Sequence, residues 1–331
     1  MRFPPLKYVL ISSARNEGQF IAKTLESVAA QTQLPERWVV VDDGSTDNTA
    51  EIAAGYAERF SWITLVRNPR REGRNLASKA NNVNGALARL ANLDFDVVGN
   101  LDADTSFEPV YMEFLMRAFA QDAKLGVAGT PFTQDGGYDS TRDSFEGENY
   151  VAGPVQLFRR ECWSEIGGYS ANPVGGMDWI AVLTARMKGW TVRSFADMRY
   201  HHHRSMGTAE RSDVAAQFSY GQKDYYLGNS PIWQLFRVTY RLSKKPYIAG
   251  GSALLFGYCL AAMRRPKRPI SDELLRFHRG EQMKKLKAIC GSLLQFKSPD
   301  NFRLATKSAA KGIPITQPVV DTPVPMPRQR E

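Results

Sequence analysis

Short apolar runs that alternate with helical patterns constrain the fold of this chain more than any other feature of its sequence. Four runs rich in Val, Ile and Leu have the length and composition of buried strands: residues 7–12, 38–41, 62–66 and 97–101. Helical patterns fill the intervals at residues 20–31, 49–60 and 77–90. Strands joined through helices pair in parallel, because the chain must cross back over the sheet before each new strand. The sequence therefore predicts an α/β fold whose mostly parallel sheet is covered by helices on both faces.

Carboxylates follow two of these strands at the point where each strand ends. Asp42 and Asp43 come directly after the second strand, and Asp102 and Asp104 come after the fourth. Side chains two residues apart in an extended segment point the same way, so Asp102 and Asp104 can present oxygens to one point. Mg²⁺ and Mn²⁺ prefer oxygen ligands and commonly share them with the phosphates of a substrate. Ligands of open α/β sheets bind at this edge, although aspartate is also common in turns and as a helix N-cap.

Other features exclude several classes of protein. The chain of 331 residues is 43% hydrophobic and 23% charged, which is ordinary for a globular protein with a sizeable core. It contains neither a Gly-x-Gly-x-x-Gly motif nor a P-loop, which disfavours dinucleotide enzymes and P-loop ATPases. Its three cysteines (Cys162, Cys259 and Cys290) are far apart and form no metal-binding pattern, which favours a reducing compartment. The N-terminus lacks the apolar segment of a signal peptide, so a cytoplasmic location is expected.

Three motifs, in their order and spacing, resemble those of the family 2 glycosyltransferases. They are Val-Leu-Ile-Ser-Ser-Ala-Arg-Asn-Glu at residues 9–17, Val-Val-Asp-Asp-Gly-Ser-Thr-Asp-Asn-Thr at 40–49 and Leu-Asp-Ala-Asp at 101–104. The resemblance covers about residues 7–205. It implies a GT-A (Rossmann-like) fold and an inverting enzyme that takes a sugar from a nucleotide-sugar donor.

The resemblance also implies roles in donor binding. Asp43 stands where the family binds the nucleobase, and Ser13 should approach the base or the ribose. Arg74 and Lys79 match basic positions that contact the base or the diphosphate in relatives, and a cation near a diphosphate is expected on electrostatic grounds. Asp102 should reach the ribose or a metal ion. From the residues alone, Asp43 could also be a helix N-cap or a turn aspartate, and Arg74 and Lys79 could belong to a solvated helix face.

A divalent cation, Mn²⁺ or Mg²⁺, is expected between the enzyme and the diphosphate. The resemblance implies that Asp104 ligates it, together with Asp102. Many GT-A enzymes take a further ligand from a histidine, and His202 in His201-His202-His203 fits that position best. Consecutive side chains cannot all face the same way, so at least one of the three histidines is structural or exposed. The metal would act as a Lewis acid that neutralises the departing nucleoside diphosphate.

The catalytic base is expected in the segment 175–179, Gly-Gly-Met-Asp-Trp. Inverting transfer needs a carboxylate that takes the proton of the attacking hydroxyl. The family has a Glu-Asp pair at the start of a helix here, and Met177 replaces the usual Glu in this chain. Asp178 is the acid that remains in the motif and is our candidate for the base. The macrodipole alone would also favour an acid at a helix N-terminus.

The C-terminal part of the chain carries the positive charge. The net charge is +9, but residues 234–312 contain 17 Lys and Arg against 4 Asp and Glu, a local +13, and the remainder is −4. Within this part, residues 247–263 form an uncharged apolar segment with basic residues on both sides. It is short for a transmembrane helix and could instead be a helix buried against the catalytic domain. We expect an element that lies in the plane of an anionic membrane surface.

These observations predict three regions: a GT-A domain (1–232), a basic helical extension (233–312) and a disordered Pro-rich tail (313–331). The expected activity is transfer of a sugar to a hydroxyl of a glycan or a polyprenyl-linked acceptor in cell-surface polysaccharide biosynthesis. The enzyme would be peripheral on the cytoplasmic face of the inner membrane. A nucleotidyltransferase and a non-catalytic nucleotide-sugar-binding protein are the alternatives. We expect no nucleic-acid partner, because the basic charge accompanies an apolar segment.

Overall fold

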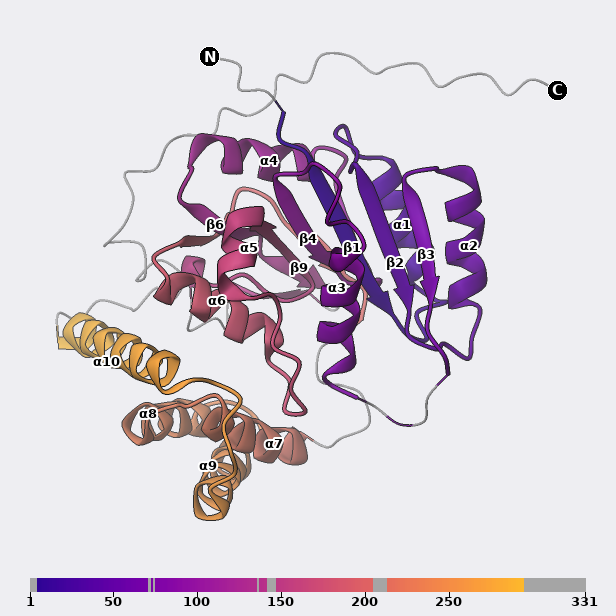
Figure 1. Ribbon diagram of the computed structural model, residues 1–331. Coiled ribbons are helices and arrows are strands. Elements are labelled where there is room, and N and C mark those ends of the chain that lie inside the picture. Colours follow the sequence, from indigo (N-terminus) through magenta and orange to yellow (C-terminus); the bar gives the residue numbers. More distant parts are fainter. Residues whose placement is uncertain are drawn as a thin grey trace.

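The computed structural model describes residues 5–70, 73, 75–135, 137–141, 147–204 and 213–294. The tail predicted for residues 313–331 lies outside these residues. The described chain forms an α/β domain with a group of helices at one end (Figure 1).

A seven-stranded sheet organises the domain. Its strands are, in spatial order, β10 (Thr191–Ser194), β6 (Leu125–Gly129), β9 (Val155–Arg159), β4 (Val97–Leu101), β1 (Tyr8–Ala14), β2 (Arg37–Asp42) and β3 (Ile63–Arg67). Strand β9 runs antiparallel to both of its neighbours, β4 and β6, and the other neighbouring strands pair in parallel. The predicted mostly parallel sheet is confirmed, and the boundaries of its elements differ from the predicted ones by at most two residues.

Helices cover both faces of this sheet (Figure 1). One face packs against α1 (Ile21–Ala29), α2 (Thr49–Arg59) and α4 (Tyr111–Gln121). The other packs against α3 (Ser78–Ala88), α5 (Arg160–Ile166) and α6 (Met177–Met187). Strand β1 shows why: Tyr8 and Leu10 enter the first core, whereas Val9 and Ile11 enter the second. Alternate side chains of a strand point to opposite faces, so an apolar run supplies two cores.

A small second sheet lies at the carboxyl ends of these strands. It contains β5 (Thr105–Phe107), β11 (Tyr200–His202), β7 (Phe132–Gln134) and β8 (Tyr138–Asp139), in that order, and a 3₁₀ turn follows at Gly147–Asn149. Strand β5 begins directly after Asp104, and β11 pairs with it so that His202 lies opposite Thr105. This pairing brings a segment from late in the chain to the end of β4.

The C-terminal helices are α7 (Asp213–Tyr226), α8 (Pro231–Leu242), α9 (Tyr247–Arg264) and α10 (Asp272–Leu294). Helices α7 and α9 pack closely at two glycines: a Cβ at Gly257 would lie 2.1 Å from the carbonyl oxygen of Phe218, and one at Gly221 would lie 2.0 Å from that of Leu254. Helix α10 contacts α6, where the rings of Trp179 and His278 meet edge to face at 4.6 Å. None of the helices in the described ranges has the length and apolar character needed to cross a membrane.

Candidate functional site

Helix α3 lies over the carboxyl ends of β1 and β2. Its side chains form hydrogen bonds with Ser13 at the end of β1 and with Asp43, the residue that follows β2. Ser78 Oγ lies 2.8 Å from both carboxylate oxygens of Asp43, to which its hydroxyl donates. One turn later, Asn82 Nδ2 donates to Ser13 Oγ at 2.9 Å. Residues four apart share one helix face, so a single face of α3 contacts both predicted donor-binding residues. The sequence did not single out Ser78 and Asn82, although their spacing in a predicted helix was a usable signal.

Lys79 on the same helix forms an ion pair with Asp102, the first residue after β4. Burial raises the pKa of Asp102, the nearby Asp104 carboxylate adds to this effect, and the Lys79 ammonium acts against it. Two residues that the sequence assigned to donor binding are therefore in direct contact. Arg74, the other predicted basic residue of this region, lies outside the described residues.

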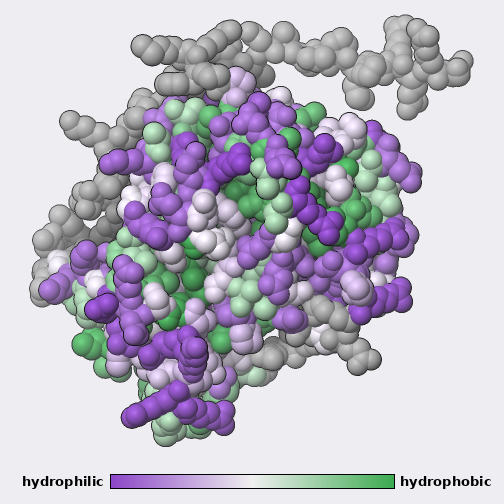
Figure 2. All heavy atoms as spheres, viewed as in Figure 1, coloured by the Kyte–Doolittle hydropathy of each residue, from purple (hydrophilic) through white to green (hydrophobic). Residues whose placement is uncertain are grey.

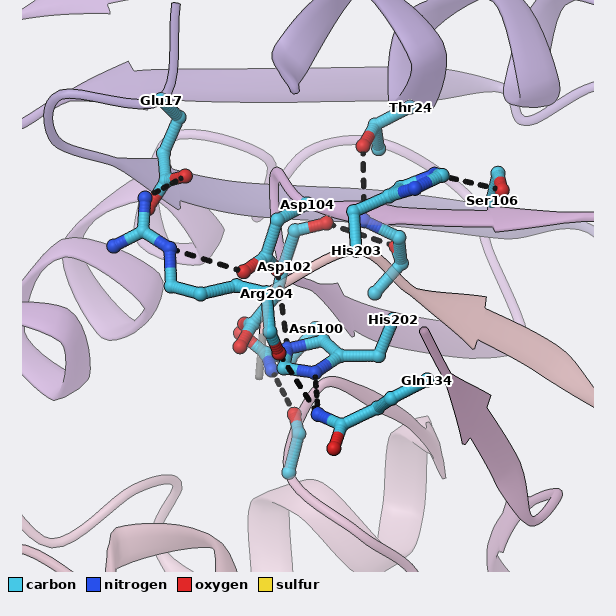
Figure 3. A network of polar contacts seen from close by, with 12 residues as sticks. Glu17, Thr24, Asn100, Asp102, Asp104, Ser106, Gln134, His202, His203 and Arg204 are labelled. Carbon is cyan, nitrogen blue, oxygen red and sulfur yellow. Dashed lines mark hydrogen bonds and ion pairs between the residues drawn. The ribbon is translucent and has the colours of Figure 1, made fainter. Parts of the chain in front are cut away.

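Asp104 and His202 face one another across the junction of the two sheets (Figure 3). His202 Nε2 lies 3.4 Å from Asp104 Oδ1, and both side chains are nearly buried. Gln134 Nε2 donates to His202 Nδ1 and to the carbonyl oxygen of Arg204, each at 2.8 Å. Because Nδ1 accepts, the proton of the neutral imidazole is on Nε2, where it faces Asp104. Burial alone would raise the pKa of Asp104, but the hydrogen bond from His202 and the charges of Arg204 and Lys79 hold it below its usual value.

Two charged residues that the sequence analysis did not assign to the site complete this cluster. Arg204 Nη2 donates to Glu17 Oε2 at 2.6 Å, and Arg204 Nε lies 3.8 Å from Asp104 Oδ2 (Figure 3). Burial, together with the charge of Asp104, raises the pKa of Glu17 to about 7 although Arg204 opposes the change. Glu17 follows β1 as Asp43 follows β2, so the rule that polar residues gather at carboxyl strand ends could have identified it. No local pattern could have identified Arg204, which is 187 residues away from Glu17.

Asp178 lies at the second position of α6, beside the segment that enters β9. The hydroxyl of Tyr150 donates to Asp178 Oδ2 at 3.0 Å. A Cβ at Gly153 would lie 2.9 Å from the same carboxylate oxygen, so only glycine leaves room for Asp178 in this position. The carbonyl oxygen of the next residue, Pro154, accepts the backbone N–H of Asp102 at 2.8 Å. Residues 153–154 thus border both the candidate base and the acidic cluster.

Within the described part of the chain, no group of three or more His, Cys, Asp and Glu side chains is arranged to hold a metal ion. Asp104 and His202 do converge on one point and supply an oxygen and a nitrogen, whereas Asp102 is directed to Lys79. Mg²⁺ and similar cations are commonly bound by one or two carboxylates, with phosphates of the substrate completing the coordination. The donor set fits a divalent cation whose remaining ligands come from a bound phosphate.

Comparison with known proteins identifies the family and the fold. The sequence pattern of the family described as "Glycosyl transferase family 2" matches residues 9–174, half of the chain. A mannosyltransferase from Pyrobaculum calidifontis, solved with GDP-Man and Mn²⁺, superposes with a TM-score of 0.52 at 20% identity, over 92% of this chain and 85% of that one. Residues 1–349 of TarS from S. aureus, solved with UDP-GlcNAc, give a TM-score of 0.53 at 15% identity, over 89% and 93% of the two chains. At these identities, the likeness establishes the fold.

Among curated proteins, the poly-beta-1,6-N-acetyl-D-glucosamine synthase of Staphylococcus aureus is 32% identical over 119 residues. The matched region covers 35% of this chain and 26% of the synthase. The chain therefore spans about a quarter of the length of the curated relatives it matches.

Proposed function

The chain belongs to glycosyl transferase family 2 and is a glycosyltransferase, and we propose that it moves a sugar, with inversion, from a nucleotide-diphosphate donor to a hydroxyl of a glycan or lipid-linked acceptor. The proposal rests on one observation: acidic and basic side chains lie close together at one edge of the sheet. Asp43, Asp102 and Asp104 follow parallel strands, while Lys79 and Arg204 arrive from α3 and from the end of β11. Cations beside carboxylates can receive a diphosphate and the metal that accompanies it.

We assign donor binding to the face of α3 and the strand ends beneath it. Asp43 can accept a hydrogen bond from a ring N–H of the base, with Ser78 fixing its orientation. Ser13, held by Asn82, would face the base or ribose. Lys79, and Arg74 by the family resemblance, would contact the diphosphate. Lys79 and Asp102 already pair, so donor binding would exchange a carboxylate partner of Lys79 for a phosphate.

Asp104 and His202 would hold the divalent cation, with Asp102 as a further ligand or as a partner of the ribose. The bound cation would supply Lewis-acid neutralisation of the charge that develops on the departing diphosphate. To bind the cation through Nε2, His202 would carry its proton on Nδ1, and the side-chain amide of Gln134 would turn so that its oxygen accepts from Nδ1. Arg204 would balance Glu17 and Asp104 before the donor arrives.

Asp178 would take the proton of the acceptor hydroxyl as that oxygen attacks the anomeric carbon. The contacts that support this role are the hydrogen bond from Tyr150, which orients one carboxylate oxygen, and the glycine at 153, which leaves space beside it. The acceptor would therefore bind between α6 and the segment that precedes β9.

The proposal also extends to the acceptor and to the place of the enzyme in the cell. The named activity of the staphylococcal relatives is synthesis of a polysaccharide, which supports a role in cell-surface polysaccharide biosynthesis. A polyprenyl-linked acceptor would sit at the bilayer, so we place the enzyme on the cytoplasmic face of the inner membrane. We retain the division into a catalytic region (1–232), a basic helical extension (233–312) and a tail (313–331). Helix α7 precedes residue 232 and packs on α9 of the extension.

The test is nucleotide release from UDP-, GDP- and dTDP-sugars, measured with Mn²⁺ and with EDTA. Wild type should hydrolyse one donor slowly in the presence of metal, and Asp104→Asn should lose about 100-fold or more of this rate, because the charge on the leaving group is no longer balanced. Asp94→Asn is the matched control: Asp94 is exposed, pairs with Lys7 and lies at the opposite end of β4. If wild type neither releases a nucleotide from these donors nor binds any of them in calorimetry, the proposal fails. Release of a sugar 1-phosphate in place of a nucleoside diphosphate, which follows from attack at the α-phosphate, would favour a nucleotidyltransferase. Donor binding without turnover in the presence of acceptor glycans would favour a binding protein.

A further inference from the structure

Helix α9 has two different apolar faces. The buried face carries mainly small residues and packs against α7 and α8: Gly250, Gly251, Leu254, Gly257, Tyr258 and Ala261. The opposite face is exposed, and its residues also recur every three or four positions: Ile248, Ser252, Leu255, Phe256, Cys259 and Met263. Ile248, Phe256 and Met263 are 73%, 60% and 69% exposed. A helix at the surface of a water-soluble protein normally presents charged or polar residues outward, and this exposed face contains no charge.

Helix α8 adds a second exposed apolar stripe. Ile232 and Leu235 are each 62% exposed, and Leu242, two turns further on, is 38% exposed. Helices α8 and α9 are consecutive and in contact, with the side chain of Leu242 packed against Gly251. The lower end of the molecule in Figure 2, where Figure 1 shows α7–α9, has hydrophobic atoms beside strongly hydrophilic side chains. We refer to the exposed residues of α8 and α9 together as the α8–α9 face.

Basic residues stand at both ends of α9. Lys244 and Lys245 precede the helix, Arg264 and Arg265 end it, and all four are exposed. From residue 225 to 271 the sequence contains eight Lys and Arg and no Asp or Glu. At the C-terminal end of α9, a surface hollow of about 570 Å³ combines the apolar side chains of Ala262 and Met263 with Arg265. Apolar surface bordered by cations is complementary to acyl chains beneath anionic headgroups.

We propose that the α8–α9 face is the surface by which this protein docks on a bilayer that contains anionic lipids, with α9 lying in the plane of the interface. The exposed side chains of α8 and α9 enter the boundary between headgroups and acyl chains, and Lys244, Lys245, Arg264 and Arg265 bind lipid phosphates. The same face is a poor match for a second copy of the chain, because two surfaces without acidic residues would repel one another.

Docking by this face has a consequence for the acceptor, and this part rests on the proposed function. The α7 region, on which α9 packs, touches the start of α6, where a Cβ at Gly176 would lie 3.3 Å from side-chain atoms of both Leu227 and Lys223. At the other end of α6, Arg186 pairs with Glu281 of α10. The helices that contact lipid are thus connected to the helix that carries Asp178 through α7, on which α9 packs, and through α10, where Gln282 accepts from the backbone N–H of Ser230 at the start of α8. A lipid-linked acceptor would reach the catalytic base from the bilayer, while a nucleotide sugar enters from water at the end of β4.

The test is sedimentation of the full-length protein with phosphatidylcholine vesicles that contain 0 or about 30% phosphatidylglycerol. Two variants probe the two components: Ile248→Asp/Phe256→Asp removes apolar insertion, and Lys244→Gln/Lys245→Gln removes cations at exposed positions where folding is not at risk. The control is Leu34→Asp, which changes an apolar residue of 45% exposure between α1 and β2. Nucleotide release without vesicles, circular dichroism and light scattering accompany each variant.

We expect wild type and Leu34→Asp to bind the anionic vesicles and to leave the neutral ones largely free. The double Asp variant should lower the partition coefficient by about 100-fold, since two large apolar side chains no longer leave water, and the double Gln variant should lower it by about 20-fold. Absence of binding by wild type, or unchanged binding by both variants, would overturn the proposal. So would a dimer of the wild type that dissociates in the double Asp variant. If any of these results is obtained while nucleotide release from the donor persists, the docking surface is refuted and the proposed glycosyltransferase function is not.

Discussion

Glu17 is a carboxylate that the folded protein keeps at the candidate site at a cost in stability, and this cost can be measured. Its side chain is only 15% exposed, and its pKa of about 7 lies roughly 2.5 above the ordinary value of 4.5. Each pKa unit corresponds to about 1.36 kcal/mol, so the ionised side chain disfavours folding by up to about 3 kcal/mol. Glu17→Gln removes the charge but keeps an oxygen that can accept from Arg204.

The sign of the pH dependence follows from the raised pKa. Below pH 4.5 Glu17 is protonated in the folded and the unfolded chain, and it imposes no penalty. Between pH 4.5 and 7 the unfolded chain releases the proton first, so stability falls as the pH rises, and the loss is complete above pH 7. We therefore expect Glu17→Gln to match wild type near pH 4.5 and to exceed it by about 2–3 kcal/mol at pH 8.5.

The assay is urea unfolding of both proteins at several pH values between 4.5 and 8.5, with EDTA present so that no cation favours the ionised carboxylate. Asp47→Asn is a control of opposite sign. Burial alone would raise the pKa of Asp47, but hydrogen bonds from Thr49 and Gly18 outweigh it and lower the pKa. Its stabilisation is therefore present above pH 3.8 and lost as the pH falls through the lowered value, so Asp47→Asn should be less stable than wild type at pH 8.5. A Glu17→Gln variant that is no more stable than wild type at pH 8.5 would refute the reasoning about Glu17.

Two further predictions concern the base and the packing of the sheet. Asp178→Asn should lower the rate of sugar transfer by about 10²–10⁴-fold, because proton removal by a positioned carboxylate contributes that much. The affinity for the donor, measured by calorimetry, should stay unchanged. Transfer by the variant at the rate of wild type would exclude Asp178 as the base. Gly129→Ala should lower the free energy of unfolding by about 1–3 kcal/mol, since its methyl group would lie 2.4 Å from the side chain of Val151. Gly55→Ala, on an exposed helical position with no atom within 4 Å, should instead raise stability by about 0.5–1 kcal/mol in the same urea titration.

The sequence by itself determined the frame of the catalytic domain. The runs at 7–12, 38–41, 62–66 and 97–101 became β1–β4, and the intervening helical patterns became α1–α3. This worked because the signals are local: the period of apolar residues decides helix or strand, and an apolar run without alternation indicates a strand buried on both faces. Placing Asp43, Asp102 and Asp104 near one another needed only the rule that parallel strands end at the same edge.

The tertiary structure decided what local pattern cannot encode. Strand β9 enters the sheet between β4 and β6 in the antiparallel sense, and the second sheet is built from strands of two or three residues, too short to show a period. That sheet carries His202 and Arg204 to Asp104 and Glu17. The exposed apolar face of α9 was also hidden in the sequence, because a helix that is apolar all round does not reveal which side its neighbours cover. The contacts of His202 and Arg204 and the packing of α9 depend on segments far apart in the chain, and only the folded structure brings those segments together.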